Sequence, residues 1–364
     1  MADYSATTDR LGLRGRTSDL IAQAVGPVLH GEQFEAAVRS VFAAFVQSAE
    51  FKAAIAQALP FERLSQASLH AQWVASNDCA LRVAESLAIG ARVDKGTQIL
   101  LAEKYKELLR AKAPLPRFDE VGFRSFSQFD EDGILLYIFS LIGTTNRRAV
   151  EACAGVGFEC NAANLIVNHG WEGMLIDGSE ANCKLSWDFY TKRSDTYITP
   201  PMIVKAWIEP ESIDEIITKN GFTGEIDLLT VDLDGIDYWV WKNITSIDPR
   251  LVVVEYQPWF DAHEPYTVKN IKGYWYPDLA EKLPGYVGCS LGAYVNLGRE
   301  KGYRLIGCNR NHLNAFFLRN DIGQDLFPEI DPATCLTARR IHETRAEYVK
   351  HRDIQLAAGE WHRA

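Results

Sequence analysis

The sequence predicts a doubly wound α/β fold with a mostly parallel sheet, preceded by a helical domain. From residue 123 onward, short β-type runs alternate with helical ones, as in a parallel sheet covered by helices on both faces. Residues 17–112 instead carry apolar side chains at three- and four-residue spacings, which is typical of helices. Between the two parts, residues 113–122 concentrate proline and turn residues, as a linker does. These observations predict three regions: a helical domain over 1–117, an α/β domain over 118–325 and a helical extension over 326–364.

In chain order, the α/β region is predicted to begin with a helix over 126–143. The β-type runs that follow are 148–153, 173–178, 197–208, 226–235 and 251–258, with a pair of strands over 303–320. Helical stretches come between them, from about 160, from about 179, and over 211–221, 237–244 and 290–302. In such Rossmann-like sheets, ligands bind at the carboxyl ends of the strands. A site is therefore expected among 151–161, 177–180, 206–208, 232–237 and 255–263.

Composition and charge exclude some classes of protein. The formal net charge of −10 argues against a general binder of nucleic acid or of anionic membranes. Seven scattered cysteines without a C-x-x-C pair fit a reducing compartment better than a disulfide framework. The N-terminus lacks the apolar core of a signal peptide, and no apolar run is long enough to span a membrane. We therefore expect a cytoplasmic protein.

The helices of the first region leave two roles open. Residues 32–59 and 96–112 form amphipathic helical stretches without internal proline. They either pack and dimerise, or they form a lid over the substrate site of the second region, and both roles are compatible. We predict a homodimer through this region.

A glycine-rich loop follows the first β-type run, in residues 150–166, VEACAGVGFECNAANLI. A nicotinamide dinucleotide site needs G-x-G-x-x-G, but Cys160 stands where the third glycine is required. A P-loop is excluded because the chain contains no G-K-[ST]. What remains is an acid at each of two strand ends, Glu151 and Asp177, which suit an ammonium group and ribose hydroxyls, while glycine amides suit a carboxylate. S-adenosylmethionine carries all three groups, and a tight turn without any ligand is the alternative.

Four segments, in this order, resemble the FkbM-like S-adenosylmethionine-dependent methyltransferases: FSQFDEDGIL, VEACAGVGFECNAANLIVNHGWEGMLIDG, GEIDLLTVDLDGIDYWVW and PRLVVVEYQP. The resemblance covers residues 123–320 and implies the class I methyltransferase fold. It implies that the cofactor pocket is closed by Gln128 and Asp132, lined at its methionine end by Glu151, Gly155, Glu159 and Asn161, completed at the ribose by Asp177, and flanked near the adenine by Ala206 and Trp207. The family pattern is usually E-x-G-x-G-x-G, so Cys153 replaces its first glycine and adds a side chain close to the ligand.

Four acids gather at the ends of the fourth and fifth β-type runs, namely Asp232, Asp234, Asp237 and Glu255. Buried like charges raise one another's pKa values, and a metal held by Asp232, Asp234 and Glu255 would relieve this. Oxygen ligands from neighbouring strands suit Mg²⁺, which would lower the pKa of an acceptor hydroxyl and orient it. Two alternatives stay open. The carboxylates of Asp232 and its neighbours could bind cofactor and substrate without metal, with Asp234 and Asp237 as catalytic groups, or Asp237 could cap the following helix.

A general base is the remaining catalytic candidate. His263, in WFDAHEPY after the fifth run, is the first choice, and His312 in NRNHLNAFF is the second. His263 lies within the aromatic-rich stretch 257–289, and His312 lies within the final strand pair. The aromatic side chains either pack at the edge of the core or form a wall for a ringed or sugar-like substrate.

These observations predict an enzyme that transfers a methyl group from S-adenosylmethionine to an oxygen of a small molecule in natural-product or sugar-like biosynthesis. Its expected cofactor is S-adenosylmethionine, with Mg²⁺ left open, and its expected partners are a small-molecule substrate and a second copy of the chain. Two alternatives are a non-methylating S-adenosylmethionine-dependent cyclase and a catalytically degenerate partner of an active methyltransferase.

Overall fold

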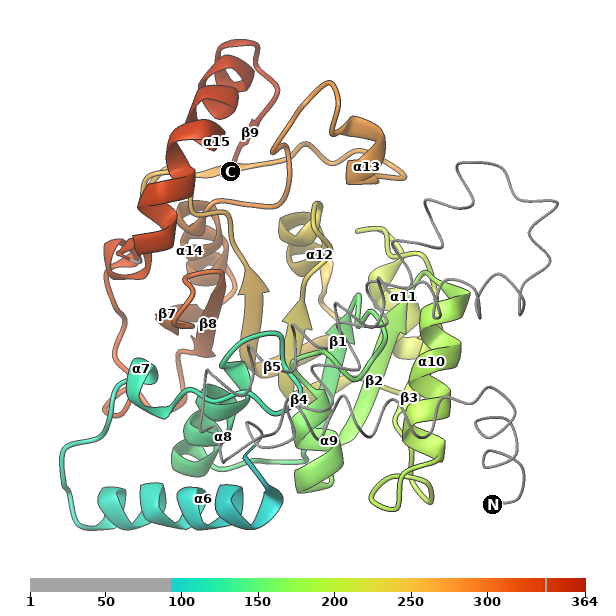
Figure 1. Ribbon diagram of the computed structural model, residues 1–364, viewed down its shortest axis with the longest axis vertical. Coiled ribbons are helices and arrows are strands. Elements are labelled where there is room, and N and C mark those ends of the chain that lie inside the picture. Colours follow the sequence, from blue (N-terminus) through green and yellow to red (C-terminus); the bar gives the residue numbers. More distant parts are fainter. Residues whose placement is uncertain (1–92, 338) are drawn as a thin grey trace, which may run out of the picture. The chain divides into compact units, whose positions relative to one another are not determined.

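The computed structural model describes residues 93–337 and 339–364, and of residues 338–347 it describes no side chains (Figure 1). The helices predicted before residue 93, and the dimer contact expected of them, lie outside the described residues. Helix α6 (Lys95–Arg110) was predicted as part of the helical N-terminal domain. It belongs to the compact unit Ala91–Ala364 and packs on α8 (Glu131–Ile142).

Seven strands form one sheet in the order β3-β2-β1-β4-β5-β8-β7 (Figure 1). Their bounds are β1 Arg148–Ala152, β2 Glu172–Asp177, β3 Met202–Lys205, β4 Gly224–Val231, β5 Ile247–Glu255, β7 Tyr303–Cys308 and β8 Asn314–Arg319. The first five strands are parallel, and β8 is antiparallel to both of its neighbours. The chain runs outward from β1 to β3 and then returns to the other side of β1 as β4, which creates a switch point between β1 and β4. The predicted doubly wound, Rossmann-like and mostly parallel sheet is confirmed.

Apolar side chains fill both faces of the sheet because its strands are buried on both sides. On β1, Val150 and Ala152 join one core and Ala149 joins the other, following the two-residue period of a strand. The first core is covered by α11 (Ile213–Lys219), α12 (Asp237–Asn243) and α14 (Leu291–Glu300), and the second by α6, α8, α9 (Ala163–His169) and α10 (Glu180–Thr191). A short helix, α7 (Phe118–Val121), occupies the stretch predicted as a linker.

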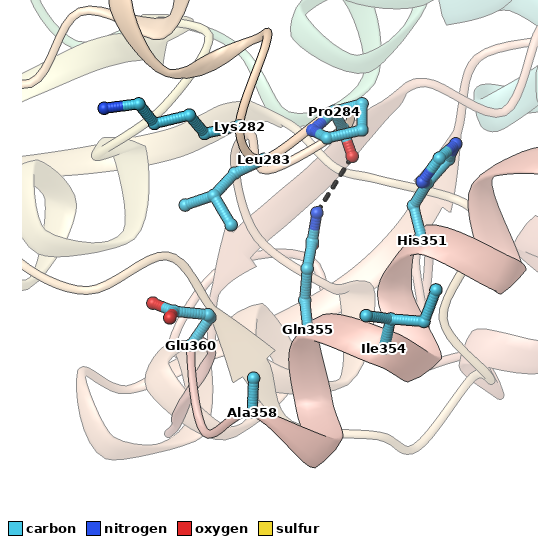
Figure 2. Close-up of a pocket in the computed structure, with 8 residues that line it drawn as sticks. All are labelled: Lys282, Leu283, Pro284, His351, Ile354, Gln355, Ala358 and Glu360. Atoms are coloured by element: carbon cyan, nitrogen blue, oxygen red, sulfur yellow. Dashed lines mark hydrogen bonds between the residues drawn. The ribbon is translucent and has the colours of Figure 1, made fainter.

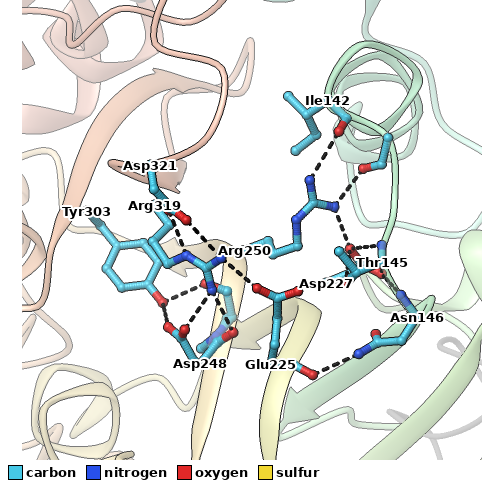
Figure 3. A network of polar contacts seen from close by, with 12 residues as sticks. Ile142, Thr145, Asn146, Glu225, Asp227, Asp248, Arg250, Tyr303, Arg319 and Asp321 are labelled. Carbon is cyan, nitrogen blue, oxygen red and sulfur yellow. Dashed lines mark hydrogen bonds and ion pairs between the residues drawn. The ribbon is translucent and has the colours of Figure 1, made fainter.

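A buried ion pair joins β4, β5 and the turn that leads into β1 at the amino ends of the strands (Figure 3). Asp227 is fully buried and accepts a 2.7 Å bond from Arg250, together with the backbone amides of Thr145, Asn146 and Arg147. Arg250 also donates to two carbonyl oxygens at the end of α8. The network ties β4 and β5 to the end of α8 and to the turn before β1 at the amino ends of the strands.

The segment after β5 and the C-terminal extension are tied to each other. The segment contains β6 (Tyr266–Thr267) and α13 (Tyr276–Leu279), and the extension contains the 3-10 helix η3 (Pro332–Leu336), α15 (Arg339–Ala357) and β9 (His362–Arg363). Strands β6 and β9 pair antiparallel, and Trp361 packs against Phe260 and Tyr286. A cavity of about 140 Å³ lies between α15 and residues 282–284. Gln355, which lines it, donates to the carbonyl of Pro284 (Figure 2). Across the part of the chain that is described, none of the helices combines the length and apolarity needed to cross a membrane.

Candidate functional site

The loop after β1 adopts left-handed backbone at three positions, Cys153 (φ +66°), Gly155 (φ +55°) and Gly157 (φ +73°). Gly157 has no room for a side chain, since a Cβ there would lie 2.1 Å from the hydroxyl of Ser186. Gly155 differs, because a Cβ there would meet no atom within 4 Å. The loop therefore exposes its backbone to open space at Gly155, where a ligand can approach it closely.

Glu151, the predicted cofactor residue at the end of β1, holds this loop in place. Its carboxylate is buried and accepts the backbone amides of Asn161 at 2.8 Å and Ala162 at 2.7 Å. Burial raises the pKa of Glu151, against which these two amides stabilise the charged form. Asn161 thus takes part through its backbone. Both residues shape the loop just before α9.

Asp177, at the end of β2, connects the same loop to the next helix. It accepts the amide of Gly155 at 2.9 Å, the amide of Ser179 at 2.8 Å and the side-chain amide of Asn182 at 3.1 Å. The thiol of Cys153 lies 4.0 Å from the same carboxylate. Asp177 therefore stands where predicted, beside the open backbone of Gly155, and one of its roles is to orient that loop.

The segment before α8 folds over this loop. Asp132 is buried, and its Oδ2 accepts three successive amides, those of Ser125, Phe126 and Ser127, at 2.5–2.9 Å. Burial raises the pKa of Asp132 to about 6. The helix predicted over 126–143 consequently begins only at Glu131, because these amides bind a carboxylate instead of entering a helix.

The other two predicted residues of this region are exposed. Gln128 lies in the segment held by Asp132, and Glu159 forms a 3.1 Å ion pair with Arg124. This pair joins the segment before α8 to the loop after β1. Asp132 acts by placing Gln128, and Glu159 acts by joining the two loops.

An exposed aromatic pair stands beside Asp177. Trp207 and Trp275 are each about half exposed, and their ring centroids are 5.9 Å apart. A Cβ on Gly178 would lie 2.9 Å from the ring of Trp207, so this ring is seated directly against the residue that follows Asp177. That Trp207 lies near the cofactor's base stays a prediction. Trp275 comes from the aromatic stretch after β5.

Three of the predicted acids come together at the ends of β4 and β5. One carboxylate oxygen from each of Asp232, Asp234 and Glu255 lies within 4.8 Å of the other two. Burial and the neighbouring carboxylates raise the pKa values of Asp232 and Glu255 well above their usual range. The side-chain amide of Gln257 donates to Glu255 at 3.4 Å. The cluster thus concentrates acidic groups, and its surroundings favour the protonated forms of Asp232 and Glu255.

Asp237 belongs to a different arrangement. It is buried at the start of α12 and accepts the amides of Leu233 and Gly235, which closes the turn that contains Asp234. Burial raises the pKa of Asp237 to about 6. Its carboxylate holds the turn before α12 and does not cap the helix, because the N-cap is Ile236 and has no side-chain hydrogen bond, so the helix-capping alternative is wrong. The catalytic role of Asp237 stays a prediction.

The two candidate bases lie in different surroundings. His263 is exposed and sits 3.7 Å from Asp331, which precedes η3. His312 is partly buried in the turn between β7 and β8, where its Nδ1 lies 3.9 Å from the sulfur of Cys308. His263 therefore contacts Asp331 and His312 contacts Cys308, and neither contact is with the three clustered carboxylates.

Sequence reasoning missed three polar groups near this edge. Glu131 is buried and accepts the side-chain amides of Asn309 and Asn314. The remaining oxygen of the Asn314 amide and the hydroxyl of Tyr294 are buried without a hydrogen-bond partner. Glu131 lies in FSQFDEDG and could have been singled out there, whereas nothing local marks Tyr294 or Asn314.

No protein-family model matches the chain, and no curated protein matches its sequence. Among solved structures, the chain is similar to magnesium protoporphyrin IX methyltransferase from Synechocystis with bound SAM (10% identity, 52% of this chain and 77% of that chain, TM-score 0.34). It is also similar to the N-terminal domain of EvdMO1 with SAH bound (14% identity, 63% and 96%, TM-score 0.35). A third similar structure is a SAM-dependent methyltransferase from Methanosarcina mazei (10% identity, 47% and 90%, TM-score 0.30). These scores are low, and the function proposed below rests on the geometry of the site.

Proposed function

We propose that this chain is an S-adenosylmethionine-dependent methyltransferase that methylates an oxygen of a small biosynthetic molecule. The observation that carries the proposal is the loop after β1, in which the left-handed backbone at Gly155 opens onto free space while its amide is held by Asp177. An acid at the end of β2 next to an open glycine turn is what a ribose and an amino-acid tail require at a switch point.

The residues present fit each part of this cofactor. Asp177 accepts bonds from three N–H groups and a long one from the thiol of Cys153 at 4.0 Å, and a ribose hydroxyl would take the place of this weak thiol bond. The exposed ring of Trp207 offers an apolar face to the adenine. Asp232 and Asp234 place two acidic groups beside the loop, and a ligand that carries an ammonium and a sulfonium would favour their charged forms.

When bound, S-adenosylmethionine supplies a methyl group on positively charged sulfur to a nucleophilic oxygen. The chain's contribution is to position the two partners, since proximity and orientation lower the barrier of such a transfer. Glu151 and Asp132 act in this by fixing the two loops that carry Gly155 and Gln128. They are positioning residues, buried away from the reacting atoms.

A divalent cation at Asp232, Asp234 and Glu255 forms part of the proposal. Three carboxylate oxygens within 4.8 Å of one another suit Mg²⁺, which prefers oxygen ligands. The hydroxyl of Tyr294 is buried near Asp237 and Glu255, and it has no hydrogen-bond partner among the described residues. This unpartnered hydroxyl is an independent indication that a ligand is held here. A cation there would favour the deprotonated form of an acceptor hydroxyl.

The acceptor is proposed to lie against the aromatic stretch after β5. Trp275 is exposed, and Tyr274 packs directly on the turn that contains Asp234, since a Cβ on Gly235 would lie 2.1 Å from the Tyr274 ring. Flat apolar rings beside a polar cluster suit a ringed or sugar-like acceptor that presents one hydroxyl. This stretch would also exclude water from the transfer.

Calorimetry with S-adenosylmethionine and S-adenosylhomocysteine tests the cofactor. Both are expected to bind, and the absence of binding at millimolar concentration of either would overturn the proposal. Asp177→Ala is expected to weaken binding about 10-fold or more, because a hydrogen bond to a charged group contributes about 1.5–3 kcal/mol. Glu172→Ala, at the exposed start of the same strand, is the matched control and should leave affinity unchanged.

Titration with Mg²⁺ alone tests the cation. The wild type is expected to bind it at millimolar concentration, whereas Asp234→Asn should weaken binding at least about 10-fold through loss of a charged ligand. Asp278→Asn, an exposed acid on α13, is the control. Equal affinity in all three proteins would refute a site at these carboxylates.

A non-catalytic alternative draws on one specific observation, the thiol of Cys153 at 4.0 Å from Asp177. A side chain at this position narrows the space next to the residue proposed to bind the ribose. If cofactor binding appears only after Cys153→Gly, the natural loop is degenerate and the chain is a partner rather than an enzyme.

A further inference from the structure

Two thiols meet at the far edge of the sheet, outside the site described above. Cys308 is the last residue of β7, and Cys335 lies in η3. The chain before η3 runs along β7, since the amide of Ile330 donates to the carbonyl of Leu305 at 3.0 Å. This brings the side chain of Cys308 into hydrogen-bonding contact with that of Cys335, which is buried.

A histidine and a tyrosine complete the cluster. The Nδ1 of His312 lies 3.9 Å from the sulfur of Cys308, and its ring also contacts the backbone of Cys335. The hydroxyl of Tyr256 donates to the carbonyl of Cys335 at 2.6 Å and contacts Cys308. Asp130 is the charged group that faces the histidine from α8's side. Cys308 therefore has two hydrogen-bonding neighbours and a basic group within reach.

These neighbours act on the thiol in a consistent direction. Contact with Cys335, outweighing burial, and contact with His312 lower the pKa of Cys308 to about 6. Burial lowers the pKa of His312, but its contacts with Cys308 outweigh this and raise it. A thiol whose pKa is lowered by a neighbouring imidazole and a second thiol is in the environment of reactive cysteines.

Other described cysteines lie in the opposite environment. Desolvation raises the pKa of each, and nearby carboxylates add to this at several of them, the set being Cys153, Cys160, Cys183 and Cys289. A buried structural thiol needs neither a basic partner nor a second thiol. Cys308 has both.

We propose that Cys308 and Cys335 form a redox modification site, in which a hydroperoxide converts the two neighbouring thiols into an intramolecular disulfide. The thiolate of Cys308 attacks one oxygen of hydrogen peroxide, the O–O bond breaks, and hydroxide leaves, which gives a sulfenic acid. Cys335 then loses its proton and attacks the sulfur of Cys308. The S–O bond breaks, water leaves, and the S–S bond forms.

The two sulfurs together lose two electrons, and one peroxide becomes two waters. His312 stabilises the attacking thiolate, and Cys335 is the resolving thiol. The bond joins β7 to η3 of the C-terminal extension. Tyr256, which follows Glu255 in the chain, donates its hydroxyl to the carbonyl of Cys335.

Alkylation of the unmodified chain with iodoacetamide at pH 7, mapped by peptide mass, is the first test. The thiolate fraction rises from about 1% at a pKa of 9 to about 90% at a pKa of 6, while the lower basicity reduces nucleophilicity about 20-fold. Burial and Asp177 raise the pKa of Cys183 above its ordinary value, so Cys308 should react more than about fourfold faster than Cys183. A rate equal to or below that of Cys183 would overturn the proposal.

Treatment with hydrogen peroxide is the second test, read by peptide mapping without reductant. The expected product is one cross-linked peptide pair containing Cys308 and Cys335, lighter by two hydrogens and reversed by dithiothreitol. Cys335→Ser should stop at a sulfenic acid that dimedone traps, and Cys308→Ser should abolish both products. Cys183→Ser, the control, should leave the cross-link unchanged.

His312→Asn tests the role of the imidazole, since asparagine tolerates the left-handed backbone (φ +55°) of this position. The rate of Cys308 oxidation should fall several-fold at pH 7 and recover at pH 9, where the thiol ionises without help. A purely structural role of the histidine would leave the pH profile unchanged. Oxidation of Cys308 to sulfinic acid without a cross-link would refute Cys335 as its partner.

Discussion

Replacing Cys153 by glycine is expected to stabilise the fold, although the change removes a side chain. Cys153 adopts φ +66°, a left-handed backbone that disfavours residues with a Cβ. The residue as a whole is exposed, so little apolar burial is lost on truncation. Its sulfur end is desolvated next to Asp177 and Asp232, and both effects raise the pKa of the thiol. The side chain therefore makes few favourable contacts in return for the strain.

The size of the effect follows from two opposing terms. Left-handed backbone costs a non-glycine residue about 1–2 kcal/mol. Glycine loses about 0.5–1 kcal/mol more conformational entropy on folding than alanine does. The net expectation is a gain of about 0.5–1 kcal/mol in the free energy of unfolding.

Urea unfolding followed by tryptophan fluorescence measures this change. The same substitution at Cys183, inside helix α10, is the control and should destabilise the protein by ~0.3 kcal/mol through helix propensity alone, because glycine is a poorer helix former than cysteine. A loss of stability in Cys153→Gly comparable to that in Cys183→Gly would refute the reasoning. Calorimetry on the same variant should show cofactor affinity at least as high as in the wild type.

Two further predictions concern the described domain. Asp227→Ala should lower the free energy of unfolding by about 3–5 kcal/mol, since it leaves Arg250 buried without its counter-charge, whereas Asp248→Ala, in an exposed ion pair, should cost less than about 1 kcal/mol. Burial raises the pKa of Asp227, but Arg250 and three backbone amides outweigh this and lower it. The contribution of Asp227 to the free energy of unfolding is therefore present above about pH 4 and is lost as the pH falls through the pKa of the folded state. In acid, urea midpoints of wild type and Asp227→Ala should accordingly converge, and a constant difference would contradict the assignment. Burial, with Lys95 and Arg147 adding, lowers the pKa of His169 to about 4, so stability should fall as pH drops from about 6.5 towards 4, and this slope should be absent in His169→Gln.

The positions of the strand-end acids could be predicted from sequence, but their partners could not. Glu151 and Asp177 follow apolar β-type runs, and in a parallel sheet such residues meet at one edge. That Glu151 is bound by the amides of its own loop depends on how residues 158–162 fold back over it. The same holds for Asp132, whose three amides replace the first turn of the predicted helix.

The candidate bases show the opposite situation. His263 was chosen because it follows a strand end, but the chain after β5 continues along α14 and the C-terminal extension, and its contact is Asp331. His312 was the second choice, and its neighbour is Cys308 rather than a carboxylate at the strand ends. Nothing in the local pattern around either histidine could have indicated these contacts.

The sequence by itself determined the doubly wound sheet, the edge at which a ligand is expected and the acids that stand there, because strand and helix periods and the residues that end them are local properties of the chain. Only the tertiary structure decided which of these acids bind backbone amides, which three lie within 4.8 Å of one another, and that Cys308 meets Cys335. A carboxylate or a thiol takes its pKa and its partners from whatever segment packs against it, and these segments come from distant parts of the chain.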